Sequence, residues 1–352
     1  MRKRKREISL GGVTIGGNAP ISVQSMTKTD TRNVSSTVKQ IHQLEKAGCE
    51  IIRVAVPDLK AAKSLSSIKE AISIPLVADI HFDHRLALEA ISQGVDGLRI
   101  NPGNIGSTDK VKSVVAAAKE RSLPIRIGVN AGSLEKGILK KHAHPTPRAM
   151  VESAMGHIKL LEKLNFFDIK VSLKSSNLMD TVQAYRLIHE KTDYPLHLGI
   201  TAAGPLYSGT IKSSIGIGIL LAQGIGDTIR VSLTGSALEE VRVGHEILRA
   251  LNLRHTGPDI ISCPTCGRCE VNIFKIVRAI EKELSTFPRN LTIAVMGCVV
   301  NGPGEAREAD IGIAGGKGVG VLFKKGKVIK KLKEEDLSRA LIKEVQSMCS
   351  PT

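Results

Sequence analysis

Four cysteines in the C-terminal part of the chain have the residue type and spacing that a metal centre needs. Cys263, Cys266 and Cys269 are spaced as C-x2-C-x2-C, and Cys298 lies further on, at the start of a stretch rich in Gly and Pro. Thiolates spaced in this way within a turn can point toward one metal ion or cluster. The spacing alone fits a structural zinc site or an iron–sulfur cluster, and tight turns rich in Gly and Pro also suit a cluster.

A second set of chemically active side chains is basic and lies inside short apolar segments. A cation stands in the middle of five of them, at Arg53, Arg99, Arg126, Lys170 and Arg230. A buried cation is costly unless it is paired or used in binding. Residues at i and i+2 share one face of a strand, and the polar residues placed in this way are Asn101, Asn130, Ser172, Lys174 and Ser232, with Asp79 and His81 together on another segment. Such a convergence predicts a phosphate or diphosphate pocket, with arginine as a bidentate donor.

The elements that must position these residues alternate along the chain. Short apolar segments predict eight strands, at 21–26, 50–56, 75–81, 97–101, 124–130, 167–174, 195–201 and 227–233. Helical periodicity fills the intervals, at 37–47, 60–71, 84–93, 108–120, 147–164, 178–192, 213–223 and 237–251. Eight strands alternating with eight helices predict the α/β class and a (β/α)8 TIM barrel over residues 1–254. The polar sets fall near the carboxyl ends of the strands, where barrels carry their active sites.

The alternating pattern stops near Arg254, and residues 255–352 are expected to form a small α+β domain. It contains the cysteine turn, a helix at 272–284, a strand at 291–296 and a Gly-rich segment at 297–320. The Lys-rich stretch 324–333 and the final helix are expected to be solvated surface.

Composition narrows the class of protein further. The chain has 352 residues, 42% of them hydrophobic, and a net charge of +16, which is ordinary for a globular protein apart from the excess of cations. Its apolar runs are too short to span a bilayer, and no apolar region follows the basic N-terminus, so we expect no secretory signal, no membrane and a cytoplasmic, reducing location. Aromatic residues make up only 3% of the chain, so few side chains are available to stack on bases, and nucleic acid is not the expected partner.

Motifs over nearly the whole chain resemble the 4-hydroxy-3-methylbut-2-enyl diphosphate synthase family of the methylerythritol phosphate isoprenoid pathway. They lie at 23–26, 98–104, 125–130, 197–201, 263–268 and 297–305. The resemblance implies the bacterial two-domain form, a barrel followed by a [4Fe–4S] domain. It also implies reductive opening of 2-C-methyl-D-erythritol 2,4-cyclodiphosphate to (E)-4-hydroxy-3-methylbut-2-enyl diphosphate. That reaction takes up two electrons, which a flavodoxin or ferredoxin supplies, and releases water.

The resemblance also assigns roles to individual residues. Cys263, Cys266 and Cys298 are expected to hold the cluster, and Glu305 to ligate its fourth iron. A carboxylate is a harder and more exchangeable ligand than a thiolate, so a substrate oxygen can displace it. The implied substrate-binding residues are Arg53, Arg99, Asn101, Arg126, Asn130, Lys174, Arg230 and Ser232, with Asp79 and His81 as further candidates; Lys170 is not among them.

Two positions depart from the family pattern. Cys269 is an extra thiol beside the ligand turn. Ala202 stands where the family has an acidic residue, two positions after Gly-Ile in the seventh strand. Because expelling water requires a proton, and a positioned acid contributes roughly 10²–10⁴ in rate, we expect this chain to bind its substrate but to turn over slowly. The alternative is that Asp79, His81 or a bound water donates the proton and the chain is fully active.

The order of the elements also predicts a quaternary arrangement. The helix at 237–251 should run back to the amino end of the barrel, and the cysteine turn follows about a dozen residues later. The cluster of a chain would then begin at the wrong end of its own barrel. We therefore expect a head-to-tail homodimer in which the cluster domain of one chain caps the barrel of the other.

The alternative to the reductive synthase function is a barrel with a zinc-stapled domain that binds phosphate-rich ligands without redox chemistry.

Overall fold

The computed structural model describes residues 3–254, 257–284, 287, 290–298, 304 and 306–348. The chain divides into two compact units, Met1–Arg254 and His255–Thr352. Within the described part of the chain, no helix is both long and apolar enough to cross a membrane.

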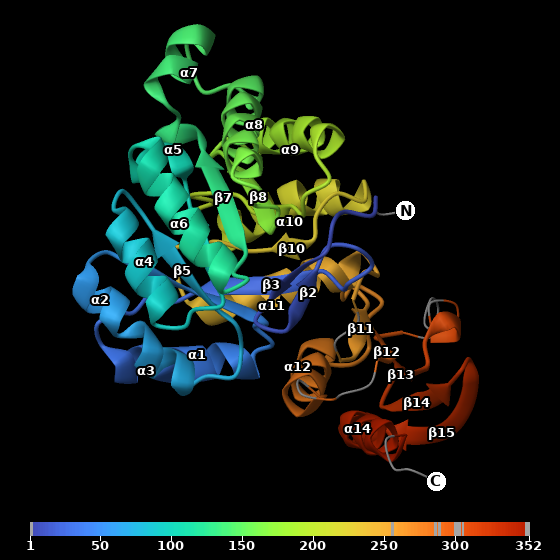
Figure 1. Ribbon diagram of the computed structural model, residues 1–352. Coiled ribbons are helices and arrows are strands. Elements are labelled where there is room, and N and C mark those ends of the chain that lie inside the picture. Colours follow the sequence, from blue (N-terminus) through green and yellow to red (C-terminus); the bar gives the residue numbers. More distant parts are fainter. Residues whose placement is uncertain are drawn as a thin grey trace. The chain divides into compact units, whose positions relative to one another are not determined.

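The first unit is a TIM barrel, as predicted (Figure 1). Its parallel strands are β3 (Ser22–Met26), β4 (Ile51–Val56), β5 (Leu76–Ile80), β6 (Gly97–Ile100), β7 (Ile125–Asn130), β8 (Ile169–Lys174), β9 (His197–Leu198) and β10 (Thr228–Ile229). They are hydrogen-bonded in the order β8-β7-β6-β5-β4-β3-β10-β9. A bridge between Val171 and Leu196 joins β8 to the β9 segment and closes the ring.

The helices of this unit follow the strands in alternation. They are α1 (Val34–Lys46), α2 (Leu59–Lys63), α3 (Leu65–Glu70), α4 (His84–Ser92), α5 (Pro102–Ile105), α6 (Thr108–Glu120), α7 (Lys136–His142), α8 (Pro147–Lys163), α9 (Leu178–Lys191), α10 (Leu206–Ala222) and α11 (Ala237–Ala250). Side-chain oxygens cap several amino ends; for example, Asn33 accepts from Ser36 N, and Thr146 from Ala149 N. The helix predicted at 60–71 is instead two helices, separated at Ser64, whose hydroxyl donates to the Lys60 carbonyl and competes with the helical pattern.

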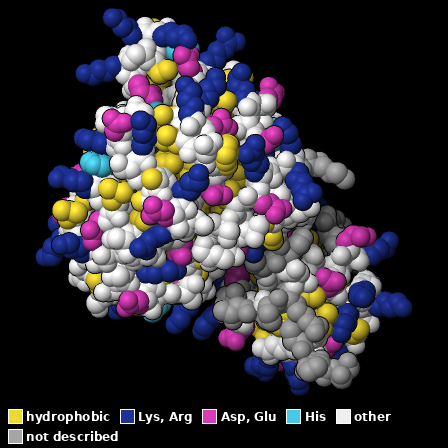
Figure 2. All heavy atoms as spheres, viewed as in Figure 1, with side chains coloured by type: hydrophobic (Ala, Val, Ile, Leu, Met, Phe, Trp, Pro, Cys, Tyr) yellow, Lys and Arg dark blue, Asp and Glu magenta, His cyan; other side chains and the backbone are white. Residues whose placement is uncertain are grey.

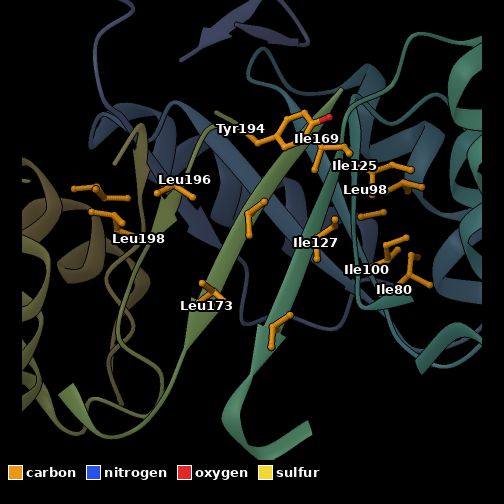
Figure 3. Close-up of a cluster of buried hydrophobic side chains, with 14 of the residues drawn as sticks. Ile80, Leu98, Ile100, Ile125, Ile127, Ile169, Leu173, Tyr194, Leu196 and Leu198 are labelled. Atoms are coloured by element: carbon orange, nitrogen blue, oxygen red, sulfur yellow. The ribbon is translucent and has the colours of Figure 1, made fainter. Parts of the chain in front are cut away.

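The strands present one apolar and one polar face. Figure 3 shows Leu98, Ile100, Ile125 and Ile127 gathered on the side of the sheet that faces the helices. These residues alternate with Arg99 and Arg126, so the basic side chains point into the barrel. The apolar core therefore lies between sheet and helices, and the interior of the barrel is lined by cations.

A hairpin that the sequence analysis did not predict closes the amino end of the barrel. It consists of β1 (Ile8–Leu10) and β2 (Val13–Ile15), joined by Gly11 and Gly12, which both have positive φ. A two-residue loop with positive φ at both positions is the type I′ turn that favours Gly. A side chain at Gly11 would collide with Asp96 and Pro75, which precede β6 and β5, so the turn lies against this end of the sheet.

Basic side chains cover much of the surface. Figure 2 shows Lys and Arg spread over the visible face, with a group at the top of the view over α7, whose last turn contains Lys140, Lys141 and His142. This distribution means that the net charge alone does not locate a binding site.

The second unit is a five-stranded sheet with helices on one face. Its strands are β11 (Asp259–Ser262), β12 (Thr292–Met296), β13 (Ile311–Gly315), β14 (Val319–Lys324) and β15 (Lys327–Lys333), in that order across the sheet. The first three are parallel, and β14 and β15 are antiparallel additions. Helices α12 (Ile273–Leu284) and α14 (Leu337–Ser347) share a core with the sheet, formed by residues such as Ile280, Val295 and Leu341. The Lys-rich stretch expected only as solvated surface is thus the edge strand β15 with its lysines exposed.

Candidate active site

A pocket of about 150 Å³ opens at the carboxyl ends of the barrel strands. It is lined by Arg53, Asp79, His81, Arg99, Arg126, Asn130, Ser172, Lys174, Ile200, Thr201, Arg230 and Ser232. The structure therefore brings together the basic and polar residues that the alternation pattern singled out on six different strand segments. Asn101 and Lys170 do not line it.

One row of the sheet places three of these side chains beside one another. Asp79 on β5 pairs in register with Arg99 on β6, and Arg99 pairs with Arg126 on β7. All three residues are almost completely buried. Two arginines side by side repel each other, and like charges on adjacent strands are destabilising, so the row depends on its carboxylate.

Asp79 is the counter-ion of the pocket. Its Oδ1 lies 3.2 Å from Arg99 Nη1 and its Oδ2 lies 3.6 Å from Arg53 Nε, while His81 Nε2 lies 3.6 Å from Oδ1. Burial alone would raise the pKa of Asp79, but the charge of Arg53, the nearby His81 side chain and the charge of Arg99 outweigh it and hold this pKa well below its usual range. Asp79 is therefore anionic and does not serve as a proton donor near neutral pH.

The pocket lining contains more basic side chains than Asp79 can neutralise. Buried nitrogens of Arg99 (Nε), Arg126 (Nε and Nη1) and Arg230 (Nε) have no hydrogen-bond acceptor in the described structure. Burial, followed by repulsion from neighbouring arginines, lowers the pKa values of Arg126 and Lys174 well below their usual range. Arginine nevertheless stays protonated in proteins. A buried charge of this kind is costly without an anion beside it, so the pocket is built to receive a polyanion.

A second buried carboxylate, which the sequence analysis missed, supports the rim of the pocket. Glu240 on α11 is 2% exposed. Its Oε1 accepts from Leu233 N at 2.9 Å and lies 2.9 Å from Lys28 Nζ, and its Oε2 lies 4.0 Å from Arg230 Nη2. Glu240 thus ties the segments after β3 and β10 together. An acidic residue on the apolar face of an amphipathic helix is the sequence signal that would have found it.

Two residues of the predicted set lie beside the pocket rather than in its wall. Asn101 is buried, and its Oδ1 accepts from Gly103 N at 3.1 Å, capping α5. Ala202 is exposed and follows Thr201, which lines the pocket; it has a positive φ of 50°. Lys170 faces a separate small cavity deeper in the barrel, together with Gln24 and Arg126, and burial lowers its pKa to about 7.

An ion pair braces the loop after β7 near Asn101. Glu135 Oε1 lies 2.6 Å from His157 Nε2 on α8, and Ser153 Oγ donates to Glu135 Oε2 at 2.8 Å. The hydrogen bond from His157 lowers the pKa of Glu135 to about 2. A side chain added at Gly103 would meet both Glu135 and His157, so this pair also packs against α5.

The cysteine turn in the second unit is folded against the end of β12. Cys263 directly follows β11, and its Sγ accepts from Gly297 N at 3.3 Å. Within the turn, Cys269 N donates to Cys266 O at 2.9 Å, and Glu270 N donates to Gly297 O at 2.8 Å. A Cβ at Gly297 would lie 2.4 Å from Cys269 Sγ and 3.3 Å from Cys263 Sγ. Glycine is therefore needed for the thiols to approach this strand end.

Among the described residues, the cysteines of this turn account for only some of the ligands that an iron–sulfur centre needs. Cys266 is exposed, Cys263, Cys269 and Cys298 are half-buried, and none of these cysteines forms a disulfide. No three potential ligands are close enough to hold one metal ion among the residues that the structure describes. The predicted ligand Glu305 lies outside the described residues.

The comparisons with known proteins cover both units. The GcpE TIM-barrel domain matches residues 5–245, and the GcpE protein C-terminal domain matches residues 259–347. The chain is 62% identical over 345 residues to the 4-hydroxy-3-methylbut-2-en-1-yl diphosphate synthase (flavodoxin) of Thermodesulfovibrio yellowstonii, covering 98% of this chain and 99% of the relative. It is 59% identical over 348 residues to the protein of the same name from Geobacter sulfurreducens, covering 99% of each.

Two of the similar solved structures each cover about 70% of this chain. The dihydropteroate synthase of Yersinia pestis matches with a TM-score of 0.51 at 12% identity, over 70% of this chain and 98% of that one. The 3-dehydroquinate dehydratase of Geobacillus kaustophilus matches with a TM-score of 0.50 at 14% identity, over 71% of this chain and 99% of that one. At such low identity these similarities show the fold only.

Proposed function

Because the chain belongs to the GcpE family, we propose that it opens 2-C-methyl-D-erythritol 2,4-cyclodiphosphate reductively to (E)-4-hydroxy-3-methylbut-2-enyl diphosphate. The relatives reported above are named as synthases of this product. The observation that best supports the proposal is the barrel pocket, whose lining holds four arginines and one carboxylate, Asp79, and in which buried arginine N–H groups have no acceptor among the described residues. A cyclic diphosphate supplies the missing anion.

The pocket residues would act first by binding. Arg53, Arg99, Arg126 and Arg230 come from four different strand segments and can each direct two N–H groups at phosphoryl oxygens. Lys174, Asn130 and Ser232 can donate further hydrogen bonds. Because Asp79 already holds Arg53 and Arg99 in place, little side-chain freedom is lost when the substrate binds.

We propose that a [4Fe–4S] cluster is held by Cys263, Cys266, Cys298 and Glu305. The thiols that leave the ends of β11 and β12, and the need for Gly297 between them, support such a centre. When bound, the cluster would pass on the two electrons that the donor supplies and would provide a Lewis-acidic iron at its carboxylate ligand. Thiolates of this kind require a reducing compartment, which supports a cytoplasmic location.

This chain has no acidic side chain at position 202 to donate the proton that the reaction needs. Asp79 is held anionic by its arginine neighbours, and Ala202 has no proton to give. The pocket is also lined by an imidazole, that of His81, and by the hydroxyls of Ser172, Thr201 and Ser232. His81 Nε2 lies 2.8 Å from Arg99 Nη1, which must donate, so the ring proton of a neutral His81 is on Nδ1. We therefore propose slow turnover with His81, or water beside it, as the proton source.

The proposed reaction needs an electron donor, and the proposed site needs a second copy of the chain. The names of the relatives include flavodoxin, and we propose flavodoxin as the electron donor of this chain. We also propose a head-to-tail homodimer. Arg254, the last residue of the barrel unit, donates to Ile21 O at 3.1 Å and lies 2.7 Å from Glu50 Oε2. Both partners precede strands β3 and β4, so the chain leaves the barrel at the end opposite the pocket.

Metal analysis and complementation test these proposals. Protein purified without oxygen should be brown and contain iron and sulfide, whereas a colourless protein with stoichiometric zinc would overturn the cluster and favour the zinc-stapled alternative. For the dimer, an Arg126→Ala chain mixed with a Cys298→Ser chain should regain activity, because one site of the heterodimer is intact. Demonstrated heterodimers without any recovery would contradict the shared site.

A further inference from the structure

The cysteine-bearing unit carries an exceptionally basic segment. Residues 317–333 contain seven Lys and no Asp or Glu. They form the turn after β13, strand β14 and the edge strand β15. Lys324 forms an ion pair with Glu344 on α14; among the described residues, no carboxylate lies within salt-bridge distance of the other lysines of this segment. Lysines of this kind are available to bind an acidic surface.

The register of the sheet places part of this segment at the cysteine end. Met296, the last residue of β12, pairs with Ala314, Ala314 with Val321, and Val321 with Lys331. Lys331 therefore lies three strands away from the strand that leads to Cys298, about 14 Å across the sheet at the usual spacing.

Residues beyond Lys331 lie still closer to that end. Lys333 pairs with Val319, next to the turn that contains Lys317. A hollow of about 430 Å³ adjoins them, bordered by Lys333, Gly318 and Lys275 at the start of α12. Two carboxylates, those of Glu334 and Glu335, border the same hollow, and Glu334 Oε1 accepts from Asn272 N at 2.9 Å.

We propose that Lys317, Lys331 and Lys333 form the docking surface for the electron donor, a small acidic flavin protein. The inference rests on the proposed function, because that function is what requires a donor. Each docked donor would give up one electron, so two dockings supply the two electrons that the substrate takes up, together with a proton, as it releases water. Opposite charge on the two proteins would raise the rate of encounter by 10–10³-fold, and more strongly at low salt.

Exposed lysines on an edge strand also have a general role, since they prevent pairing with another sheet edge. That role needs charge anywhere along the strand, whereas docking needs charge at the cysteine end. Lys325 and Lys327 provide the matched control. Both are exposed: Lys327 begins β15, about 20 Å from Lys333 at the usual rise per residue, and Lys325 lies in the turn just before it.

The experiment compares two donors on the full-length protein. The Lys331→Glu/Lys333→Glu variant should lose at least tenfold in kcat/KM for reduced flavodoxin, and its salt dependence should flatten. Its rate with reduced methyl viologen, a small cation, should not fall, and its iron and sulfide content should be unchanged. Lys325→Glu/Lys327→Glu, with the same change of charge, should stay within twofold of the wild type with both donors.

Other outcomes separate the two proposals. A loss below twofold in the first variant, an equal loss in the control, or a loss with both donors would overturn the docking surface. Failure of the wild-type protein to turn over even with methyl viologen would instead contradict the proposed function. In that case the affinity of flavodoxin for the three proteins, measured by titration calorimetry, still decides the docking proposal: it must weaken in the first variant only.

Discussion

Replacing Asp79 by Asn tests whether one carboxylate holds the cationic pocket together. Asn has nearly the same shape, so the substitution removes charge without creating a cavity. Asp79 lies 3.2 Å from Arg99 and 3.6 Å from Arg53, and all three side chains are at most 8% exposed. Removing one partner of a buried pair costs roughly 3–5 kcal/mol. At about 2–4 °C per kcal/mol for a domain of this size, the melting temperature of the barrel should fall by about 10 °C.

The same variant should respond more strongly to an anion. With Asp79 neutral, the arginines lack their counter-ion, and inorganic pyrophosphate should bind more tightly. A tenfold gain in affinity would add about 1.4 kcal/mol of stabilisation at saturating ligand.

Thermal scans with and without pyrophosphate measure both effects. Asp83→Asn is the control, because Asp83 pairs with the exposed Arg85 on the surface, where such a pair contributes little. A fall below about 2 °C in Asp79→Asn, or a pyrophosphate response no larger than that of the wild type, would refute the reasoning.

The remaining predictions concern the proton, the cluster and a brace. Ala202→Glu should raise turnover at least tenfold with unchanged iron content, and equal rates would show that the acid is not needed at this position. Cys269→Ser should keep a full complement of iron and sulfide while Cys263→Ser loses it; a loss in Cys269→Ser alone would reassign the fourth ligand. Glu135→Gln should lower the melting temperature at pH 7 by breaking the pair with His157. Because the folded-state pKa of Glu135 is lowered to about 2, its contribution is complete above about pH 4.5 and is lost as the pH falls toward 2. The difference between wild type and variant should therefore shrink below pH 4.5, and a constant difference would contradict the pair as its cause.

The barrel could be predicted from the sequence because its strands are buried on the helix-facing side and turn a regular set of cations inward. Ile52 and Val54 around Arg53 are typical, and the pocket shows that this alternation identified most of its lining. The same alternation did not distinguish Lys170, which faces a cavity deeper in the barrel, from Lys174, which lies four residues later and lines the pocket.

Other features were missed because local pattern did not determine them. Strand β15 was not predicted because its lysines face solvent and its pairing with β14 is a tertiary contact. The position of Glu240 on the apolar face of its helix marked it as unusual, but its pairing with Lys28 depends on how α11 packs beside the segment after β3. Tertiary contacts, and not local sequence propensity, determine the structure at an edge strand such as β15 and the pairing of a side chain such as Glu240.

The most direct test of the central claim is product formation by the protein as it exists. Protein prepared without oxygen would be mixed with 2-C-methyl-D-erythritol 2,4-cyclodiphosphate and reduced methyl viologen, and the phosphorus NMR spectrum followed with time. The account predicts that the cyclic diphosphate signals give way slowly to those of a linear allylic diphosphate, with two viologens oxidised per molecule formed. Protein that holds its iron–sulfur cluster and binds the cyclic diphosphate, yet leaves it unchanged while viologen stays reduced, would contradict the account.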